Sequence, residues 1–270
     1  MPLKKSIPAT TRNMSASSAG MHAVSAAALM KAQPAANTPN RLLAALPRKD
    51  RERLVPQCES VELSFAQTLH RSGEVIEHIY FPLDSLVSLV TSVDRTARLE
   101  VGLIGNEGLV GTAIALGVEA SPWDAVVQGA GFAMRMPAKA FCEALADSDE
   151  LQRSLNRYLC VLLSQFSRNA ACTRFHVVES RLARWLLMTQ DRAQTDEFHL
   201  THEFLAFMLG VRRVGITRAA SALQNKTLIS YRRGNIRILD RQGLESAACS
   251  CYQANNQTYE RILAYPPHIV

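Results

Sequence analysis

Apolar residues recur along this chain with a spacing that changes near residue 137, which separates a predicted strand-rich region from a predicted helical one. Before that point, short runs of branched and aromatic residues alternate with turn signals such as Ser72-Gly73 and Gly129. The runs cover residues 61–65, 67–70, 77–81, 86–93, 98–104, 123–128 and 132–136. Many short strands at this spacing predict a β-sandwich or jelly-roll barrel. A short helical entry over residues 41–55, interrupted at Pro47, precedes the first strand.

Beyond residue 137 the apolar positions follow a helical period, with one short helix over 138–146 and a long helix from Asp149 to about Phe175. Four residues of the long helix are spaced alternately by four and three positions, like a coiled-coil seam: Leu151, Leu155, Tyr158 and Leu162. A neighbouring stripe is available to pack on the chain's own barrel: Leu159, Leu163, Phe166 and Ala170. Two apolar stripes predict two packing partners, of which the chain's own barrel is one. The alternative is a helix buried wholly within one subunit.

Two helices around a glycine turn are predicted further along the chain, after a helix that starts at Val178 and a polar loop over 191–198. The first of the two spans residues 201–209 with Thr201 as a suitable N-cap, and Gly210 can leave it with positive φ. The second spans 212–224, and its residues available for burial are Val214, Ala219, Ala220 and Leu223. Two extended segments follow, at residues 228–231 and 235–239. This order is typical of a helix-turn-helix unit whose second helix enters a major groove of DNA.

The net charge of the chain is concentrated on that unit. The 270 residues carry 30 Lys or Arg and 24 Asp or Glu, which gives a net charge of +6. Eight of the basic residues lie between residues 205 and 245, against only Asp240 and Glu245: Arg212, Arg213, Arg218, Lys226, Arg232, Arg233, Arg237 and Arg241. That stretch therefore carries +6 by itself and the remainder is neutral, as attraction to phosphates would require. A solvated basic face on an ordinary helical hairpin is the alternative interpretation.

The stretch from Thr201 through Gly210, Arg212-Arg213 and Arg218 to Leu228-Ile229-Ser230 resembles the winged helix-turn-helix of the Crp/Fnr family of bacterial transcription regulators. The similarity extends over residues 41–239 and is most specific in this carboxy-terminal part. It implies an α+β fold with an N-terminal antiparallel β-roll of the jelly-roll, cyclic-nucleotide-binding type. A long helix, which the resemblance implies forms a homodimer through its seam, and a C-terminal winged helix-turn-helix complete the expected fold. The seam consists of Leu151, Leu155, Tyr158 and Leu162.

The resemblance also implies which side chains contact DNA. It places Arg213 and Arg218 at positions where the family has base-contacting arginines, so bidentate contacts to guanine are expected. The family often has an acidic residue between them, whereas this chain has Val214, so the familiar half-site is not assumed. Contacts to phosphates or flanking base edges are expected from Arg212, Thr217, Thr201 and His202, and contacts at the wing tip from Arg232 and Arg233.

A β-roll of this family can hold a cyclic nucleotide, with a Gly-Glu pair on the ribose and an Arg beside Ser or Thr on the phosphate. The candidate effector-binding residues here are Glu107, Gly108, Trp123 and Asp124. Glu107 matches the ribose-binding acid, but Trp123 and Asp124 stand where the arginine and the hydroxyl would be. Because nothing basic lies between residues 107 and 128 and a carboxylate repels a phosphate, we expect no binding of cAMP or cGMP in the usual mode.

The cysteines lack the C-x-x-C pairs of zinc or redox sites: Cys58, Cys142, Cys160, Cys172, Cys249 and Cys251. Reduced thiols are the simplest interpretation, so neither a metal site nor a cofactor is predicted. An iron–sulfur sensor of the family's usual kind needs cysteines near the amino terminus, and none precedes Cys58. A haem sensor would need an axial ligand such as His70, His78 or Cys58. The C-x-C pair Cys249 and Cys251 leaves redox sensing or metal binding open.

The predicted regions are a disordered tail (1–40), a β-roll sensor domain (41–147), a dimerisation helix with hinge (148–177), a winged helix-turn-helix domain (178–243) and a C-terminal extension (244–270). The tail is rich in Ala, Ser, Thr, Asn and Pro, so it buries too little apolar surface to offset the entropy of ordering. Lys4 and Lys5 ahead of residues 23–30 leave a signal peptide as an alternative, and Met14, Met21 and Met30 leave a later translation start open.

We therefore expect a cytoplasmic homodimeric transcription regulator whose partners are double-stranded DNA and itself, with RNA polymerase as a further candidate and no membrane. In each subunit, the second helix of the helix-turn-helix would enter a major groove. The two grooves would be successive, about 34 Å apart, so the dimer would read a roughly palindromic site. No G-x-S-x-G, H-E-x-x-H or P-loop motif is present, so we expect no enzyme. The alternatives are a constitutive or ligand-free DNA-binding protein with a degenerate barrel, a redox- or haem-responsive regulator, and an interaction module that does not bind DNA.

Overall fold

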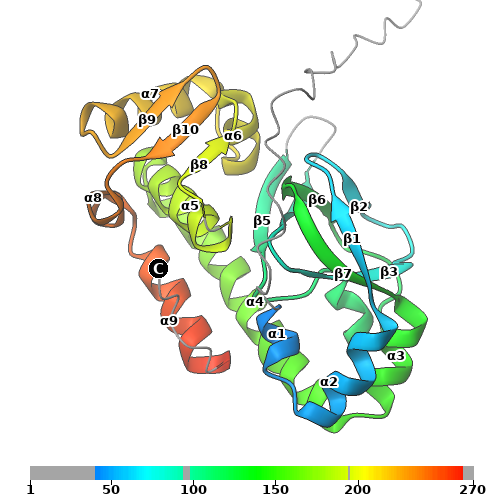
Figure 1. Ribbon diagram of the computed structural model, residues 1–270. Helices are drawn as coiled ribbons and strands as arrows, with labels where there is room; N and C mark the ends of the chain where they lie inside the picture. The colour runs from blue at the N-terminus through cyan, green and yellow to red at the C-terminus, as the bar shows by residue number, and fades with distance from the viewer. Residues whose placement is uncertain (1–39, 94–97, 194, 264–270) are drawn as a thin grey trace, which may run out of the picture. The chain divides into compact units, whose positions relative to one another are not determined.

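The β-roll contains all seven predicted strands in the computed structural model, which describes residues 40–93, 98–193 and 195–263 (Figure 1). The strands are β1 (Glu59–Leu63), β2 (Thr68–His70), β3 (His78–Pro82), β4 (Leu86–Ser92), β5 (Arg98–Ile104), β6 (Asp124–Gly129) and β7 (Gly131–Pro137). Each overlaps the apolar run that predicted it. The predicted disordered tail lies outside the described residues, except at Asn40.

The strands form two antiparallel sheets, in the orders β1-β7-β3 and β2-β6-β4-β5. Side chains from both sheets fill one core, among them Leu63, Ile79, Phe81, Val87, Leu89, Ile104, Val127 and Met136. β4 does not alternate, because residues 86–90 are all buried. The second face of this sheet is covered as well: Val90 and Leu103 pack in a second core with residues of α5 (Val178–Ala193).

Short helices close the β-roll: α1 (Arg41–Ala44), α2 (Arg48–Leu54), η1 (Val55–Gln57), η2 (Thr112–Leu116) and α3 (Ala138–Ala146). Asn40, predicted as the last residue of the tail, is instead part of the fold and is 1% exposed. Its side-chain oxygen accepts the N–H of Leu43, and its amide nitrogen donates to the carbonyls of Pro82 and Gly108 at 3.0 and 2.8 Å. This cap fixes the point at which the chain enters the β-roll.

Helix α4 (Asp149–Phe175) has the predicted bounds, and the Ser148 hydroxyl caps it by accepting the N–H of Leu151 at 3.1 Å. The seam residues Leu151, Leu155, Tyr158 and Leu162 are buried in the core of the β-roll. The prediction that they form the dimer interface is therefore wrong. Of the stripe predicted to pack on the barrel, Leu163 and Ala170 are exposed, while Leu159 and Phe166 are half-buried. The helical period defines the two stripes, but it does not say which one meets the barrel.

The carboxy-terminal half follows the predicted order with one added strand. After α5 come β8 (Glu197–His199), α6 (His202–Leu209), α7 (Arg213–Asn225), β9 (Ile229–Arg232) and β10 (Asn235–Ile238). The predicted polar loop over 191–198 is wrong at both ends, because α5 extends to Ala193 and β8 pairs with β10. Phe198 lies opposite Ile236 in that pairing, which completes a three-stranded sheet in the order β8-β10-β9.

The C-terminal extension forms two helices, α8 (Arg241–Ala247) and α9 (Cys251–Leu263). Asp240 caps α8 by accepting the N–H of Gly243 at 2.9 Å, so the first of these helices begins three residues before the predicted start of the extension at 244. α9 packs alongside α4 (Figure 1). Among the described residues, no helix is both long enough and apolar enough to cross a membrane.

Candidate nucleic-acid interface

The first part of the candidate interface is the pair of helices α6 and α7. The Thr201 hydroxyl caps α6 by accepting the N–H of Phe204 at 3.1 Å, and Gly210 ends α6 with a φ of +62°, both as predicted. Leu205, Ile216 and Leu223 from the two helices pack in the same core as α5. This packing fixes α7 with one face buried and the other exposed.

The exposed face of α7 carries the predicted recognition residues. Arg213, Thr217 and Arg218 are exposed, and so is Arg212, the residue that precedes the helix. Val214 is 55% exposed, so the prediction that it is buried is wrong. Ile216 takes the inward position, because residues 216, 219, 220 and 223 are the ones that share the buried side of the helix. An apolar side chain therefore lies between the arginines on the outward surface.

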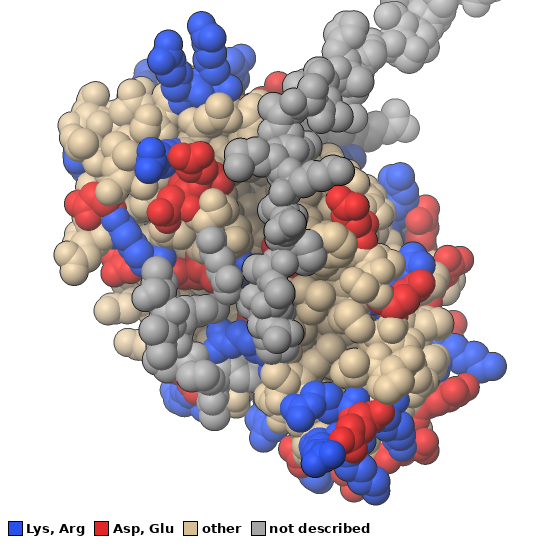
Figure 2. All heavy atoms as spheres, viewed as in Figure 1, with Lys and Arg blue, Asp and Glu red and all other residues tan. Residues whose placement is uncertain are grey.

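The β9–β10 hairpin forms the second part of the interface. Its turn contains Arg233 at a φ of +51° and Gly234 at a φ of +85°. Two consecutive positive φ angles are typical of the tight turns that match the twist of a two-stranded hairpin. Arg232 and Arg233 are exposed at this turn, and Lys and Arg side chains project at the tip of the hairpin in Figure 2. This hairpin is the wing that the sequence predicted.

The basic residues of this region fall into two groups. Three pair with acids within the chain: Lys226 with Glu179 at 2.6 Å, Arg237 with Glu197 at 3.5 Å, and Arg241 with Asp191 at 2.7 Å. In the described part of the chain, the other five have no carboxylate oxygen within 4 Å: Arg212, Arg213, Arg218, Arg232 and Arg233. These five lie on α7 and the wing, where uncompensated positive charge favours an anionic partner.

His202 connects α6 to both α7 and the wing. Its ring stacks on Tyr231 of β9 with the ring centroids 4.5 Å apart, and its Nδ1 lies 3.1 Å from the hydroxyl oxygen of Thr217. Burial, with the charge of Arg213 as the second cause, lowers the pKa of His202. The ring is therefore neutral near pH 7, and its contacts indicate a role in holding α7 in position.

The candidate effector-binding acid, Glu107, is already paired within the chain. Its Oε1 lies 2.8 Å from Nε of Arg192 on α5, and the two side chains are 3% and 7% exposed. Its Oε2 accepts the N–H of Gly105 at 3.1 Å. Tyr259 of α9 adds its hydroxyl 3.4 Å from Oε1, and its ring lies under the Arg192 guanidinium. Sequence reasoning missed Arg192 and Tyr259, which lie 85 and 152 residues from Glu107.

The other three candidate effector residues also contact neighbours in the chain. Gly108 lies against the Tyr158 ring, so closely that a Cβ there would overlap the Tyr158 hydroxyl. Trp123 packs edge-on against Phe166 with the ring centroids 5.3 Å apart. Asp124 accepts the N–H of Ser72 at 2.9 Å. The four residues therefore make structural contacts with different partners.

The candidate haem ligands have local hydrogen bonds. Nε2 of buried His70 lies 2.8 Å from the carbonyl oxygen of His78, and burial lowers the pKa of His70. The Cys58 thiol donates to the carbonyl of Leu54 at 3.5 Å, and burial raises its pKa to about 11. Both side chains therefore already have a hydrogen-bond partner within the chain.

The structure also brings together residues that sequence reasoning did not connect. Cys172 and His176 at the end of α4 meet Cys249, which precedes α9, and Cys251, the first residue of α9. The C-x-C pair was recognised in the sequence. The spacing of Cys172 and His176, one helical turn apart, was the signal that could have completed the set.

Comparison with known proteins agrees with this geometry. Residues 180–247 match the family of Crp-like helix-turn-helix domains. A structure from Eubacterium rectale, described as a transcriptional regulator of the Crp/Fnr family, shares 18% identity at a TM-score of 0.60, and the match covers 76% of this chain and 96% of that one. FixK2 from Bradyrhizobium japonicum shares 14% identity at a TM-score of 0.60, over 72% of this chain and 98% of that one.

A third solved structure, the c-di-GMP-responsive global regulator CLP from Xanthomonas campestris, shares 16% identity at a TM-score of 0.59, over 71% of this chain and 99% of that one. A comparison with curated proteins found no match. Identities this low show the shared fold, while the domain match rests on the residues that form α5, the two helices, the wing and α8. Residues 180–247 therefore form a Crp-like helix-turn-helix domain, and the chain as a whole shares its fold with solved regulators of the Crp/Fnr family.

Proposed function

We propose that the protein is a transcription regulator of the Crp/Fnr type, which binds duplex DNA as a homodimer and reads base pairs with the exposed face of α7. The observation that carries the proposal is the group of five exposed arginines on α7 and the wing, none of which has a carboxylate partner in the described chain. Most of the affinity of DNA-binding proteins comes from neutralising phosphates, and specificity comes from a few side chains that reach base edges.

The positions of the side chains on α7 favour a division of roles. Arg213 and Arg218 are suited to bidentate contacts with guanine in the major groove. Val214, exposed between them, is suited to contact with a thymine methyl group. Arg212, with Arg232 and Arg233 of the wing, is suited to phosphate contacts that set the register of the protein on the duplex.

The first experiment selects binding sites from a random duplex pool and then compares variants on the selected site and on random DNA. We expect Arg218→Ala to weaken binding to the selected site by about 1–3 kcal/mol, roughly 5- to 150-fold, and to leave binding to random duplex nearly unchanged. Arg48→Ala is the control, because Arg48 is exposed on α2 and pairs with Glu52 at 2.6 Å. Equal losses on both DNAs would show that Arg218 contacts only phosphate.

A second copy of the chain is expected on the outward face of α4. Six exposed residues there are spaced alternately by four and three positions: Asn156, Cys160, Leu163, Ser167, Ala170 and Arg174. This is the spacing of a coiled-coil seam, and Leu163 at its centre is 65% exposed. Two α4 helices packed through this seam would present two α7 helices to successive major grooves of a palindromic site.

Leu163→Glu tests the dimer surface, because it places a charge at the centre of the seam. Leu116 on η2 is also 65% exposed but does not belong to this seam, so Leu116→Glu is the matched control. We expect Leu163→Glu to shift the protein toward monomer in sedimentation velocity and to lose affinity for the palindrome, while Leu116→Glu stays dimeric. A dimer that tolerates Leu163→Glu would place the interface elsewhere.

The β-roll supports a regulator that does not respond to cAMP in the usual mode. The carboxylate that would contact a ribose is held by Arg192, Gly105 and Tyr259. The same observation favours a second candidate function, a DNA-binding protein whose barrel has lost its ligand. Footprinting with and without cell extract separates the two, because only a ligand-responsive regulator changes its affinity when extract is added.

A further inference from the structure

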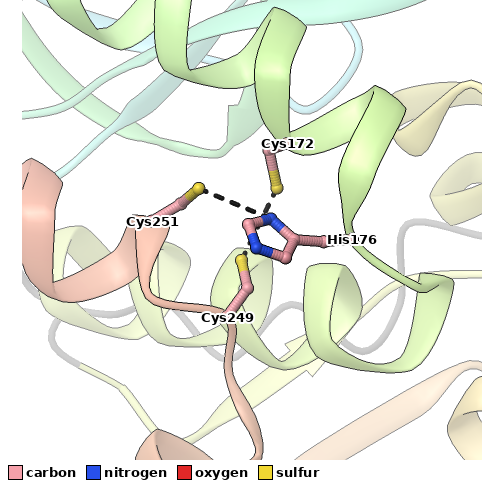
Figure 3. A group of neighbouring side chains, drawn as sticks. All are labelled: Cys172, His176, Cys249 and Cys251. Atoms are coloured by element: carbon pink, nitrogen blue, oxygen red, sulfur yellow. Dashed lines mark hydrogen bonds between the residues drawn. The ribbon is translucent and has the colours of Figure 1, made fainter.

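Four side chains of the types that bind metals converge at the junction of α4, α5 and α9. Cys172 and His176 lie one turn apart at the end of α4, Cys249 lies in the connection between α8 and α9, and Cys251 is the first residue of α9. Figure 3 shows the four side chains pointing toward one another. Cys172, Cys249 and Cys251 are buried, and their thiols form a small cluster of their own.

The distances within this cluster fit a single tetrahedral ion. The Sγ atoms of Cys172 and Cys249 are 3.5 Å apart, Sγ of Cys251 lies 3.6 Å from Nδ1 of His176, and all four ligand atoms lie within 4.8 Å of one another. Zinc bonds of about 2.3 Å to sulfur and about 2.0–2.1 Å to nitrogen, at tetrahedral angles, separate two sulfurs by about 3.8 Å and a sulfur from a nitrogen by about 3.6 Å. A cubane iron–sulfur cluster spreads its ligands over four irons and needs a wider arrangement.

The buried positive charges around the cluster also favour a bound metal ion. Arg181 and Arg184 of α5 are both buried, and in the described chain neither has a carboxylate oxygen within 4 Å. The charge of Arg184 acts on the thiols of Cys172 and Cys249, and the same two thiols interact electrostatically with Arg181. Among the described residues, the Nε atoms of both arginines also lack a hydrogen-bond partner. Three thiolates and a neutral imidazole around a divalent ion carry a net charge of −1, which compensates buried positive charge that neutral thiols leave unbalanced.

One of these arginines is held in place by α4. Nη1 of Arg184 donates to the side-chain oxygen of Asn169 at 2.6 Å, and Asn169 in turn donates to the carbonyl of Val101 on β5 at 2.7 Å. Groups that surround metal ligands tune and orient a site, and they are placed by packing in the same way as the ligands. Arg184 is therefore fixed next to the thiols, independently of whether an ion is bound.

We propose that Cys172, His176, Cys249 and Cys251 form a Cys₃His site that binds one zinc ion. All four coordination positions are filled by protein side chains, which is the arrangement of structural zinc sites, so the site has no position left for a substrate. Two ligands come from the last turn of α4 and its C-cap, and two come from the segment that leads into α9.

The ion would cross-link the start of α9 to the junction between α4 and α5. The backbone already joins these segments there, since the N–H of Cys249 donates to the carbonyl of Ser180 at 3.3 Å. Because α5 begins at Val178, the ion would fix the segment that connects α4 to the Crp-like domain. Loss of zinc would release this cross-link, so the site offers a route by which metal supply alters DNA binding.

The test measures metal in the full-length protein purified without chelator. We expect about one zinc per chain by elemental analysis, and a loss of most of it in Cys249→Ser and Cys251→Ser. Cys142→Ser is the matched control, because Cys142 is an exposed cysteine on α3 outside the cluster, and we expect it to keep the zinc. Retention of zinc by both ligand variants would overturn the proposal.

A second measurement does not depend on the variants folding. Wild-type protein stripped of metal and titrated with Co²⁺ should develop tetrahedral d–d bands and a thiolate-to-cobalt charge-transfer band that saturate at about one equivalent, and zinc should displace them. Octahedral or absent bands would overturn the proposal. So would iron with acid-labile sulfide in the purified protein, or a disulfide between Cys172 and Cys249 in protein prepared under reducing conditions.

Discussion

The buried ion pair between Arg192 and Glu107 connects α5 to the β-roll, and breaking it should destabilise the protein strongly. In Arg192→Met the Glu107 carboxylate loses its partner at 2.8 Å and keeps only the Gly105 N–H and the Tyr259 hydroxyl. Removing one member of a buried pair costs about 3–5 kcal/mol, because the other charge stays desolvated. For a chain of this size, 3 kcal/mol corresponds to a fall in Tm of roughly 6–12 °C.

A double-mutant cycle isolates the interaction itself. Glu107→Gln should also cost about 3 kcal/mol, because the charged Arg192 guanidinium would remain buried with neutral partners alone, among them the Met188 carbonyl at 3.0 Å and the Tyr259 hydroxyl at 3.4 Å. The double variant should be more stable than the sum of the two single changes predicts, with a coupling energy of about 2–3 kcal/mol. Urea denaturation at one fixed protein concentration measures all four proteins and avoids a shift from dimer dissociation.

The Arg48–Glu52 pair provides the control for this cycle. Its nitrogen and oxygen are 2.6 Å apart, but the side chains are 83% and 62% exposed, so solvent screens the pair. Arg48→Met should therefore change the free energy of unfolding by less than about 1 kcal/mol. If Arg192→Met and Glu107→Gln were equally mild and their effects added, the pair would be solvated in solution and this reasoning would be wrong.

Three further predictions follow from the same structure. Burial raises the pKa of Glu100 to about 7 from an ordinary value of 4.5, although Ser88 and Trp185 hydrogen-bond to it, so the folded state holds the proton more tightly than the unfolded state. The free energy of unfolding should then fall as pH rises between about 4.5 and 7. The free energy of unfolding of Glu100→Gln, relative to that of the wild type, should rise by on the order of 2–3 kcal/mol between pH 5 and 8. A difference between the two proteins that does not change with pH in chemical denaturation would contradict this. Val214→Ala should weaken the binding free energy by about 1 kcal/mol for a duplex that carries the contacted thymine, and should have no effect once that thymine is replaced by uracil, which lacks the methyl group. Equal losses of affinity for both duplexes would exclude a methyl contact. Calorimetric titration with cAMP should show no binding, and micromolar affinity that Glu107→Gln abolishes would overturn the effector interpretation.

The local elements were predictable from the sequence because their signals are local. Seven apolar runs gave the seven strands of the β-roll, and Thr201 with Gly210 bounded α6 correctly. The bounds of α4 followed from the polar residues that end at Asp149 and from the helical period beyond them. In each case neighbouring residues carry the information, through capping, turn geometry and periodicity.

What failed depended on contacts between distant parts of the chain. The choice between the two stripes of α4 depends on the close approach of Tyr158 to Gly108, which no periodicity reveals. Glu107 gave no sign in the sequence that Arg192 would neutralise it. Cys172 and Cys249 are 77 residues apart, so their meeting depends on how α8 leads the chain back to α4.

The same approach gives Gly108 a mechanical importance that its small size conceals. Because Gly108 has no side chain, the phenol ring of Tyr158 packs directly against the backbone of the 105–111 loop. The loop and the middle of α4 are therefore in close contact, with no room for a Cβ atom between them. A displacement of the loop therefore requires a displacement of α4. A change in the conformation of residues 105–111 would then shift the helix that precedes α5 and the helix-turn-helix.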